Sequence, residues 1–142
     1  MLVCYSAQAS VVVAGRLGLL GIRKGYYLYA GSALGPGGLQ ARLAHHMRRA
    51  PKPHWHIDYL RTVVSLRQIW FCYGRERREH DWADALEREL GCAVPYAGFG
   101  SSDCGCKSHL FWLGKRPVLA AFDDAISGAD PAHPPILWCD PR

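Results

Sequence analysis

In the first third of the chain, apolar residues cluster into short runs that glycine and small polar residues separate. Residues 2–8 and 11–14 are rich in β-branched and other apolar side chains and predict two strands, with a hairpin turning near Ala9-Ser10. The run Gly25–Gly31 is aromatic, is bounded by glycines, and predicts another strand. The glycine-rich stretch 32–38 after it is expected to be a loop.

Further along, apolar residues recur every three to four positions, which predicts helices. In segment 39–49, Leu39, Leu43 and Met47 are four residues apart and share one helix face. Helices are also predicted at 54–64, at 79–90, where Gly91 ends the helix, and at 117–126. Two dense apolar runs, 66–73 and 109–113, predict strands, the first of them central in its sheet.

This order of elements predicts a fold of the α/β (α+β) class. Strands and helices alternate without regular βαβ spacing, so we expect a small mixed or antiparallel central β-sheet flanked by helices. The 142 residues suffice for one substantial core, and no repeat or long linker divides them. We predict a single domain over residues 1–142, with its core in about 1–114 and a C-terminal helix and tail in 115–142.

The charge balance favours an anionic partner. The net charge is +5, and basic side chains crowd the end of the predicted helix 39–49. Arg48, Arg49 and Lys52 are therefore candidate nucleic-acid-binding residues. The amino terminus lacks the basic start of a secretory signal and is interrupted too early to cross a membrane. We expect a cytoplasmic protein whose partner is a nucleic acid and not a membrane.

The predicted helix 39–49 carries a polar stripe beside its apolar one. Two arginines and two histidines occupy positions i, i+3, i+4 and i+7 of one face: Arg42, His45, His46 and Arg49. Arginine offers a forked donor to phosphate oxygens, and histidine moves protons near neutral pH, so this face suits a phosphodiester. A solvated basic face is the alternative interpretation.

One carboxylate falls on the inward face of the predicted helix 79–90. Trp82, Leu86 and Leu90 form the apolar stripe of this helix, and Glu79 lies on the same side. A carboxylate that points at a core is costly unless it is paired, hydrogen-bonded or bound to a metal. Glu79 is therefore a candidate metal ligand, and the alternative is a helix-terminus carboxylate stabilised by the helix dipole.

The cysteines suggest a second metal site. Without an export signal, the six cysteines favour reduced thiols or metal ligands over disulfides. The pattern Cys104-x-Cys106-x-x-His109 offers three ligands for a structural Zn²⁺. The fourth ligand is expected among His54, His56 and Cys92. Buried thiols and a hydrogen-bonded histidine are the alternative.

The start of the predicted helix 54–64 contains two histidines and a carboxylate. His54 and Asp58 are four residues apart, close enough for the carboxylate to orient the imidazole. Together with His56, they are candidate residues supporting an active site. A helix-start histidine without a catalytic part is the alternative.

Three longer blocks carry a family resemblance. They are Gly25-Tyr-Tyr-Leu-Tyr-Ala-Gly-Ser-Ala-Leu-Gly35, His54-Trp-His-Ile-Asp-Tyr-Leu60 and Phe99-Gly-Ser-Ser-Asp-Cys-Gly-Cys-Lys-Ser-His-Leu-Phe111. The pattern Leu39-x-x-Arg42-x-x-x-His46 lies between the first two blocks. In this order the blocks resemble the GIY-YIG nuclease superfamily, in particular its small Uri-type branch. The resemblance runs from about residue 15 to residue 113.

The resemblance implies a metal-dependent endonuclease that hydrolyses phosphodiester bonds of DNA, in DNA repair or processing. In such enzymes the residues that Tyr29 and His46 match activate the attacking water, as a general base would. The residue that Arg42 matches stabilises the transition state. Glu79 matches the glutamate that binds one divalent cation, Mg²⁺ or Mn²⁺.

One part of the family pattern has no clear match. The Gly-x-Tyr tripeptide of the leading strand is missing, since Tyr5 follows Leu-Val-Cys without a glycine. Counted back from the turn at Gly15–Gly18, the expected tyrosine falls just before Met1. Either the chain begins inside that strand, or Tyr5 substitutes from a shifted register and is a catalytic residue.

Three hypotheses of function remain after these observations. The first is the DNA endonuclease, the second a catalytically weak nucleic-acid-binding module, and the third a zinc-stabilised interaction domain. Metal-dependent nicking of plasmid DNA separates the first hypothesis from the second. Metal analysis of the purified protein tests the third.

Overall fold

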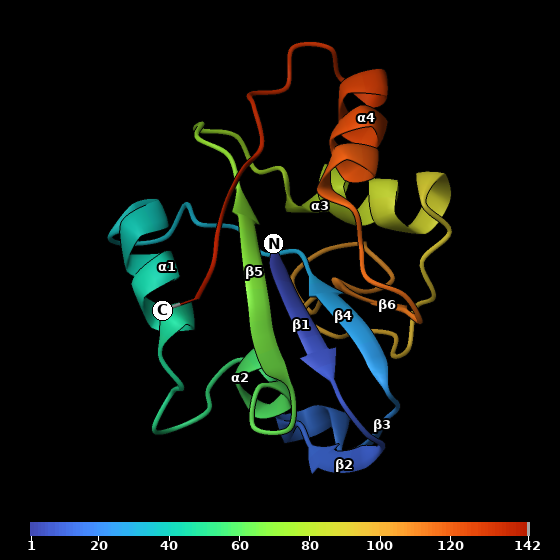
Figure 1. Cartoon of the computed structure of the whole chain (residues 1–142). Coiled ribbons are helices and arrows are strands. Elements are labelled where there is room, and N and C mark those ends of the chain that lie inside the picture. Colours follow the sequence, from blue (N-terminus) through green and yellow to red (C-terminus); the bar gives the residue numbers. More distant parts are fainter. Residues whose placement is uncertain (142) are drawn as a thin grey trace.

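An antiparallel sheet forms the centre of the computed structural model, which describes residues 1–141 (Figure 1). The strands are β1 (Leu2–Ser6), β2 (Ser10–Val13), β3 (Leu19–Ile22), β4 (Gly25–Tyr29), β5 (Ser65–Phe71), β6 (Leu110–Leu113) and β7 (Leu137–Cys139). The helices are α1 (Gly38–Met47), α2 (His56–Leu60), α3 (Glu79–Asp84) and α4 (Leu119–Ala129). A π-helical turn, Ala85–Glu89, extends α3.

Five strands pair in the order β6-β4-β1-β5-β7, and every neighbouring pair is antiparallel. An antiparallel sheet flanked by helices confirms the predicted fold class. The central strand is β1, while β5 lies beside it and not in the centre as expected.

The predicted hairpin between the first two strands is wrong. β2 pairs with β3 in a separate two-stranded sheet, and β1 pairs with β4 and β5. Both edges of β1 are thus occupied, and the chain reverses after β2 instead. Gly15 and Gly18 allow this reversal because their φ angles are +52° and +74°.

Both faces of the five-stranded sheet are buried, which explains its dense apolar strands. On one face, Val3 and Leu28 pack with side chains of α3 and α4, among them Trp82 and Phe122. The other face is covered by α1, α2 and the β2–β3 hairpin, where the side chains of Leu2, Cys4, Tyr27, Tyr29, Ile57 and Leu60 lie together. Successive residues of β1 point to opposite faces, as a strand requires.

The C-terminal part belongs to the same core, although the core was expected to end near residue 114. Phe122 and Ile126 of α4 are buried, and β7 pairs with β5 at the sheet edge. The expected tail is therefore in part a strand. The predicted helix 54–64 is shorter than expected, with α2 confined to His56–Leu60. Among residues 1–141, no helix has the length and apolar character needed to cross a bilayer.

Candidate functional site

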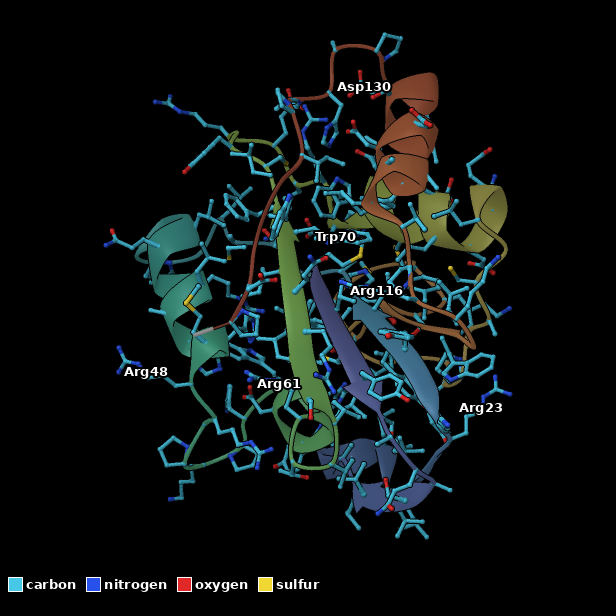
Figure 2. All side chains as sticks on the ribbon, viewed as in Figure 1. Arg23, Arg48, Arg61, Trp70, Arg116 and Asp130 are labelled. Atoms are coloured by element: carbon cyan, nitrogen blue, oxygen red, sulfur yellow. The ribbon has the colours of Figure 1, made fainter. Side chains whose placement is uncertain are left out.

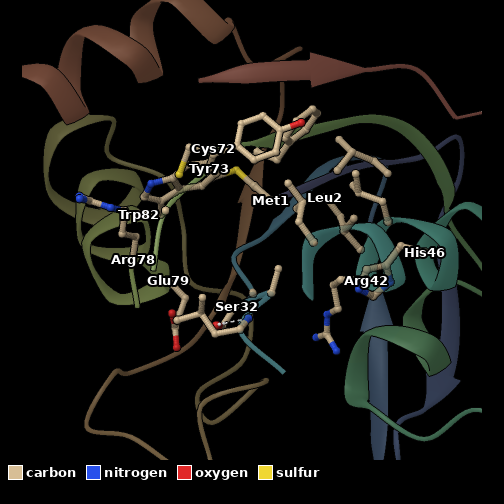
Figure 3. Close-up of a pocket in the computed structure, with 18 of the residues that line it drawn as sticks. Met1, Leu2, Ser32, Arg42, His46, Cys72, Tyr73, Arg78, Glu79 and Trp82 are labelled. Atoms are coloured by element: carbon tan, nitrogen blue, oxygen red, sulfur yellow. Dashed lines mark hydrogen bonds between the residues drawn. The ribbon is translucent and has the colours of Figure 1, made fainter. Parts of the chain in front are cut away.

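One pocket gathers four of the five residues predicted to be catalytic or to bind the catalytic metal. It lies where the start of β1 and the end of β4 meet α1 and the first turn of α3. Four of the predicted residues line it: Tyr29, Arg42, His46 and Glu79. They come from three elements that are far apart in the sequence. Figure 3 shows Glu79 and Arg42 entering from opposite sides, with Ser32 between them.

Tyr29 ends β4, and its ring lies against two glycines. A Cβ on Gly31 would come 3.1 Å from the ring, and one on Gly100 would come 2.7 Å from it. Gly100 also has a φ of +68°, which other residues rarely adopt. The close approach of the ring therefore requires glycine at position 100, while a side chain at position 31 would press the ring by a few tenths of an ångström. Burial raises the pKa of Tyr29, so its phenol stays protonated at neutral pH and is not a general base in its resting state.

Arg42 is half-buried on α1 and stacks on an aromatic ring. Its guanidinium carbon lies 4.2 Å from the centre of the Trp55 ring. A Cβ on Gly31 would lie 3.6 Å from an N–H group of Arg42, so the guanidinium reaches the backbone beside Tyr29. Stacking uses the face of a guanidinium and leaves its N–H edge to bind an anion.

His46 is buried on α1, and its surroundings keep it neutral. Burial, together with the charges of Arg42 and His45, lowers the pKa of His46 to about 3. Its Nδ1 atom is buried and has no hydrogen-bond partner among residues 1–141. The expectation that His46 moves protons near neutral pH is therefore wrong, because burial in this cationic setting disfavours the imidazolium.

Glu79 begins α3 and is buried, with 8% of its surface exposed. Its Oε1 atom lies 3.8 Å from Nε2 of His80, which is too far for a hydrogen bond. Its Oε2 atom is buried without a hydrogen-bond partner in the part of the chain that the structure describes. The predicted inward position of Glu79 is confirmed. An unsatisfied buried carboxylate oxygen is costly, and a cation would satisfy it.

Asp58 orients a histidine, but not the predicted one. Its Oδ1 atom lies 3.0 Å from Nε2 of His45, and its Oδ2 atom accepts hydrogen bonds from the backbone N–H groups of His54 and Trp55. Because α2 begins at His56, His54 precedes the helix, and the i, i+4 geometry does not apply to it. The prediction that Asp58 orients the imidazole of His54 is therefore wrong.

His56, the first residue of α2, supports the loop that packs on Tyr29. Its Nδ1 atom accepts a hydrogen bond from the backbone N–H of Gly100 at 3.1 Å. Burial lowers the pKa of His56, which keeps the ring neutral and its nitrogen able to accept. The ring of His56 also packs against Phe99, with centroids 5.5 Å apart. His56 thus holds Gly100 against the Tyr29 ring.

Tyr5 does not reach the pocket. The register between β1 and β4 places Leu2 opposite Tyr29 and Tyr5 opposite Tyr26. The rings of Tyr5 and Tyr26 lie 4.8 Å apart, and Arg67 covers the Tyr5 ring. Because Tyr5 is not among the pocket-lining residues, its assignment as a substitute for the missing tyrosine is wrong.

The basic residues near the end of α1 divide into exposed and buried ones. Arg48, Arg49 and Lys52 are exposed and accessible to an anionic partner. Arg61 is buried and donates hydrogen bonds to the backbone carbonyls of His46 and Arg48. Figure 2 shows Arg48 at the end of α1 and Arg61 closer to the sheet. Arg61 therefore satisfies the last carbonyls of the helix, a role that the sequence pattern did not reveal.

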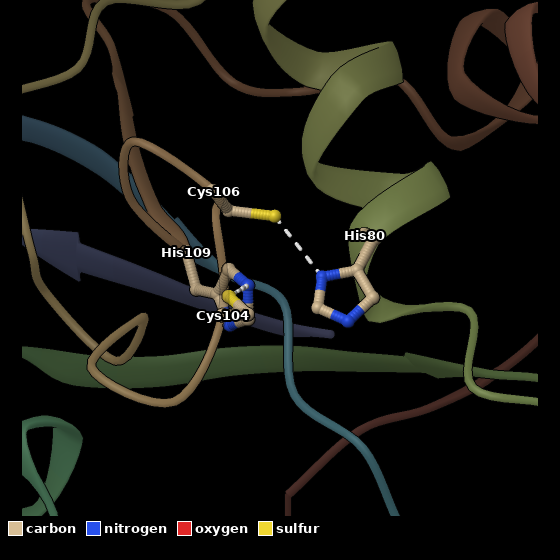
Figure 4. A group of neighbouring side chains, drawn as sticks. All are labelled: His80, Cys104, Cys106 and His109. Carbon is tan, nitrogen blue, oxygen red and sulfur yellow. Dashed lines mark hydrogen bonds between the residues drawn. The ribbon is translucent and has the colours of Figure 1, made fainter.

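A second candidate centre, the thiol–imidazole group, consists of His80, Cys104, Cys106 and His109 (Figure 4). One ligand atom from each residue lies within 4.8 Å of the others, so the group could bind a metal ion. Sγ of Cys106 is 3.0 Å from Nδ1 of His80, and Sγ of Cys104 is 3.4 Å from Nε2 of His109. Burial and the neighbouring Cys104 raise the pKa of the Cys106 thiol to about 11.

The fourth member of this group is His80, which sequence analysis missed. The candidates had been His54, His56 and Cys92. His56 instead bonds Gly100, and Cys92 is buried in the apolar core. His80 lies 24 positions before Cys104, and the one available signal was its position directly after Glu79 at a helix start.

Comparison with known proteins places the chain in a family. The family model described as "Domain of unknown function DUF123" matches residues 1–130. The chain belongs to the DUF123 family. The DUF123 match includes the pocket, the thiol–imidazole group and all four helices, whereas β7 lies beyond it. No curated protein and no solved structure matches the chain.

Proposed function

We propose that this DUF123 protein is a metal-dependent DNA endonuclease of the GIY-YIG type that acts in DNA repair or processing. The observation that carries the proposal is the composition of the pocket. Arg42 and Glu79 stand on its opposite walls, and Tyr29 and His46 line it with them. In metal-dependent cleavage of a phosphodiester, a cationic group stabilises charge on the phosphate and a carboxylate holds the metal ion.

Glu79 fits the part of the metal ligand. Its buried Oε2 atom has no hydrogen-bond partner within residues 1–141, and it lines the pocket. Mg²⁺ is commonly held by only one or two carboxylates, together with water and substrate phosphates. A bound Mg²⁺ or Mn²⁺ would stabilise charge on the phosphate and on the leaving oxygen and would acidify a coordinated water.

The other pocket residues position the phosphate and the water. Arg42, stacked on Trp55, presents its N–H edge to the phosphate and stabilises the charge of the transition state. The Tyr29 phenol is protonated and orients the attacking water by a hydrogen bond. His46 is a neutral imidazole of low basicity and serves as a hydrogen-bond acceptor at the inner wall.

A DNA partner suits the charge around the pocket. Arg48, Arg49 and Lys52 are exposed near the end of α1, the helix that supplies Arg42. Exposed basic residues bind the phosphate backbone by a sequence-independent, salt-sensitive interaction. The same helix would thus bind DNA at its end and deliver Arg42 to one phosphate.

A structural Zn²⁺ in the thiol–imidazole group is part of the proposal. Two cysteine sulfurs and two histidine nitrogens are a donor set of tetrahedral structural zinc sites. Mg²⁺ prefers oxygen ligands, so the two candidate centres select different ions. This chemistry separates a structural ion at the thiol–imidazole group from a catalytic ion at Glu79.

The test of the proposal is a nicking assay on supercoiled, branched and single-stranded DNA, with and without Mg²⁺. We expect cleavage of at least one substrate that requires Mg²⁺ or Mn²⁺ and stops on chelation. DNA binding without cleavage at any metal concentration would instead support the catalytically weak binding module. Absence of both binding and cleavage would favour the zinc-stabilised interaction domain.

A further inference from the structure

His80 stands between the two candidate metal centres. Its Nδ1 atom lies 3.0 Å from Sγ of Cys106 in the thiol–imidazole group. Its other ring nitrogen, Nε2, lies 3.8 Å from Oε1 of Glu79. One imidazole ring therefore faces the cysteines with one nitrogen and the pocket carboxylate with the other. Figure 4 shows the ring of His80 facing Cys106 from helix α3.

The thiol–imidazole group has the dimensions of a tetrahedral zinc site. Zn–S bonds of about 2.3 Å and Zn–N bonds of about 2.0–2.1 Å place ligand atoms roughly 3.3–3.8 Å apart. The Cys106–His80 and Cys104–His109 distances, 3.0 Å and 3.4 Å, lie close to that range, and no pair of ligand atoms is more than 4.8 Å apart. Small movements of side chains would therefore bring four donors around one ion.

We infer that zinc in the thiol–imidazole group positions Glu79 through His80, so that the structural ion and the catalytic ion are energetically coupled. The inference rests on the proposed function, because it assigns Glu79 to a metal ion in the pocket. His80 is in this view a positioning residue, since it acts on the pocket through Glu79.

The tautomer of His80 explains the coupling. A metal ion on Nδ1 leaves the ring proton on Nε2, the nitrogen that faces Oε1 of Glu79. Metal-bound histidines commonly donate this second N–H to a carboxylate, which fixes both groups. Oε1 would then be held by His80, and the unpartnered Oε2 would remain for the pocket cation. Without zinc, neither the tautomer nor the rotation of the ring is fixed.

Zinc would also anchor the first turn of α3. His80 is the second residue of this helix, while the other three ligands lie 24 to 29 positions later, in the loop before β6 and at its edge. Two thiols and two imidazoles on one ion cross-link these segments. Because Glu79 directly precedes His80, the cross-link restrains the backbone that carries the carboxylate.

The first experiment measures zinc on the full chain, without any cleavage assay. Wild-type protein should contain about one zinc ion per chain, and Co²⁺ in its place should give a thiolate-to-cobalt charge-transfer band. Cys106→Ser should lose the ion, whereas Cys139→Ser, outside the group, should keep it. If wild-type protein binds no zinc and its Co²⁺ form lacks the band, the inference is overturned, whatever the variants do.

The second experiment measures the coupling. Glu79→Gln should weaken zinc binding about 10-fold in a competition with a chelator, because the zinc-bound His80 loses its carboxylate partner. The matched control Glu89→Gln removes an exposed carboxylate of the adjoining π-helical turn and should leave zinc affinity unchanged. Equal zinc affinity in wild type and Glu79→Gln would overturn the coupling.

The third experiment separates positioning from simple folding. His80→Cys retains a zinc ligand but removes the N–H that faces Glu79. We expect it to keep zinc and its melting temperature, yet to bind Mn²⁺ in the pocket about 10-fold more weakly by calorimetry. Wild-type Mn²⁺ affinity in this variant would overturn the inference. If the wild-type protein cleaves no DNA but its zinc and Mn²⁺ affinities are coupled as expected, only the proposed nuclease function is contradicted. The two affinities are measured without DNA, so the two failures can be told apart.

Discussion

The α1 wall and the α3 wall of the pocket differ in charge and in how their side chains are held. On the α1 wall, Arg42 stacks on Trp55, and His46 is buried and neutral. On the α3 wall, Glu79 is buried with one oxygen that has no hydrogen-bond partner among the described residues. The α1 wall is therefore suited to an anion, and the α3 wall to a cation. A phosphodiester with its metal ion contains both.

The two walls are also stabilised differently. The end of α1 is held from within the chain, because Arg61 donates to the carbonyls of His46 and Arg48. At the start of α3, in contrast, Glu79 has a long contact with His80, and its Oε2 atom has no hydrogen-bond partner among residues 1–141. The end of α1 thus has its carbonyls satisfied within the chain, while Oε2 of Glu79 on the α3 wall would gain a partner from a metal ion. Changes on the α3 wall should accordingly have the largest effects on chemistry.

Removing the charge of the α3 wall should have the largest effect. Glu79→Gln keeps the shape of the side chain but removes the negative charge that would hold the cation. We expect cleavage to fall about 100-fold or more, with DNA affinity nearly unchanged. Single-turnover rates with DNA fully bound measure this loss. If this variant cleaves at the wild-type rate, Glu79 is not the metal ligand, and Glu87 would be tested next.

Removing the charge of the α1 wall should reduce the chemical step by about 100-fold, as loss of one transition-state donor typically does. Arg42→Ala should leave DNA binding largely intact, because Arg48 and Arg49 remain exposed. Arg42→Lys is the matched control, since it keeps the charge and loses the forked geometry. A solvated basic face predicts the opposite result, weaker binding and an unchanged single-turnover rate at saturating protein.

His46 should affect stability in acid more than it affects catalysis near neutral pH. Its pKa is lowered to about 3 in the folded chain, whereas an unfolded histidine titrates near 6.5. The unfolded state therefore binds the extra proton first, and stability is lost as pH falls from about 6.5 towards 3. Between pH 7 and pH 5 this loss is about 2 kcal/mol.

The variant His46→Gln, which has no titrating group at this position, tests whether His46 causes the loss of stability at low pH. Its free energy of unfolding, measured in urea, should change less between pH 7 and pH 5 than that of wild type. A wild-type pH dependence in the variant would show that other groups cause the acid loss. The pH–rate profile near pH 6–7 should likewise keep its shape in His46→Gln, because His46 does not titrate there.

The smallest effect concerns the surface beyond the α1 wall. Log affinity for DNA should fall with log salt concentration with a slope of roughly −3 to −5. Lys52→Ala removes one exposed cation and should make the slope about one unit less steep, without changing cleavage of fully bound DNA. A flat salt response in wild type would show that these basic residues do not face DNA.

The residues that line the pocket were predictable because local patterns place them. Arg42 and His46 share one face of a helix. The apolar residues that follow Glu79 show which side of its helix faces inward, and Glu79 lies on that side. Tyr29 ends a strand whose flanking glycines mark it in the sequence. Each of these features depends on neighbours within a few positions.

The features that were missed depend on partners distant in sequence. Tyr5 was misplaced because the register between β1 and β4 is set by the packing of whole strands. His80 was missed because its contact with Cys106 arises only when α3 docks beside the cysteine loop. His46 was predicted to be a histidine that titrates near neutral pH. The spacing of residues along a helix does not show how deeply a polar side chain on it is buried, and His46 is buried.

The last strand has a consequence for the boundaries of the domain. β7 covers the outer edge of the last three residues of β5, with Phe71 opposite Leu137 and Ile69 opposite Cys139. The DUF123 match ends at residue 130, before this strand. A chain cut at that boundary would keep both centres but would expose the backbone N–H and C=O groups of β5. An open edge is a template for pairing with strands of other molecules, so we expect the shortened chain to be less soluble than the full one.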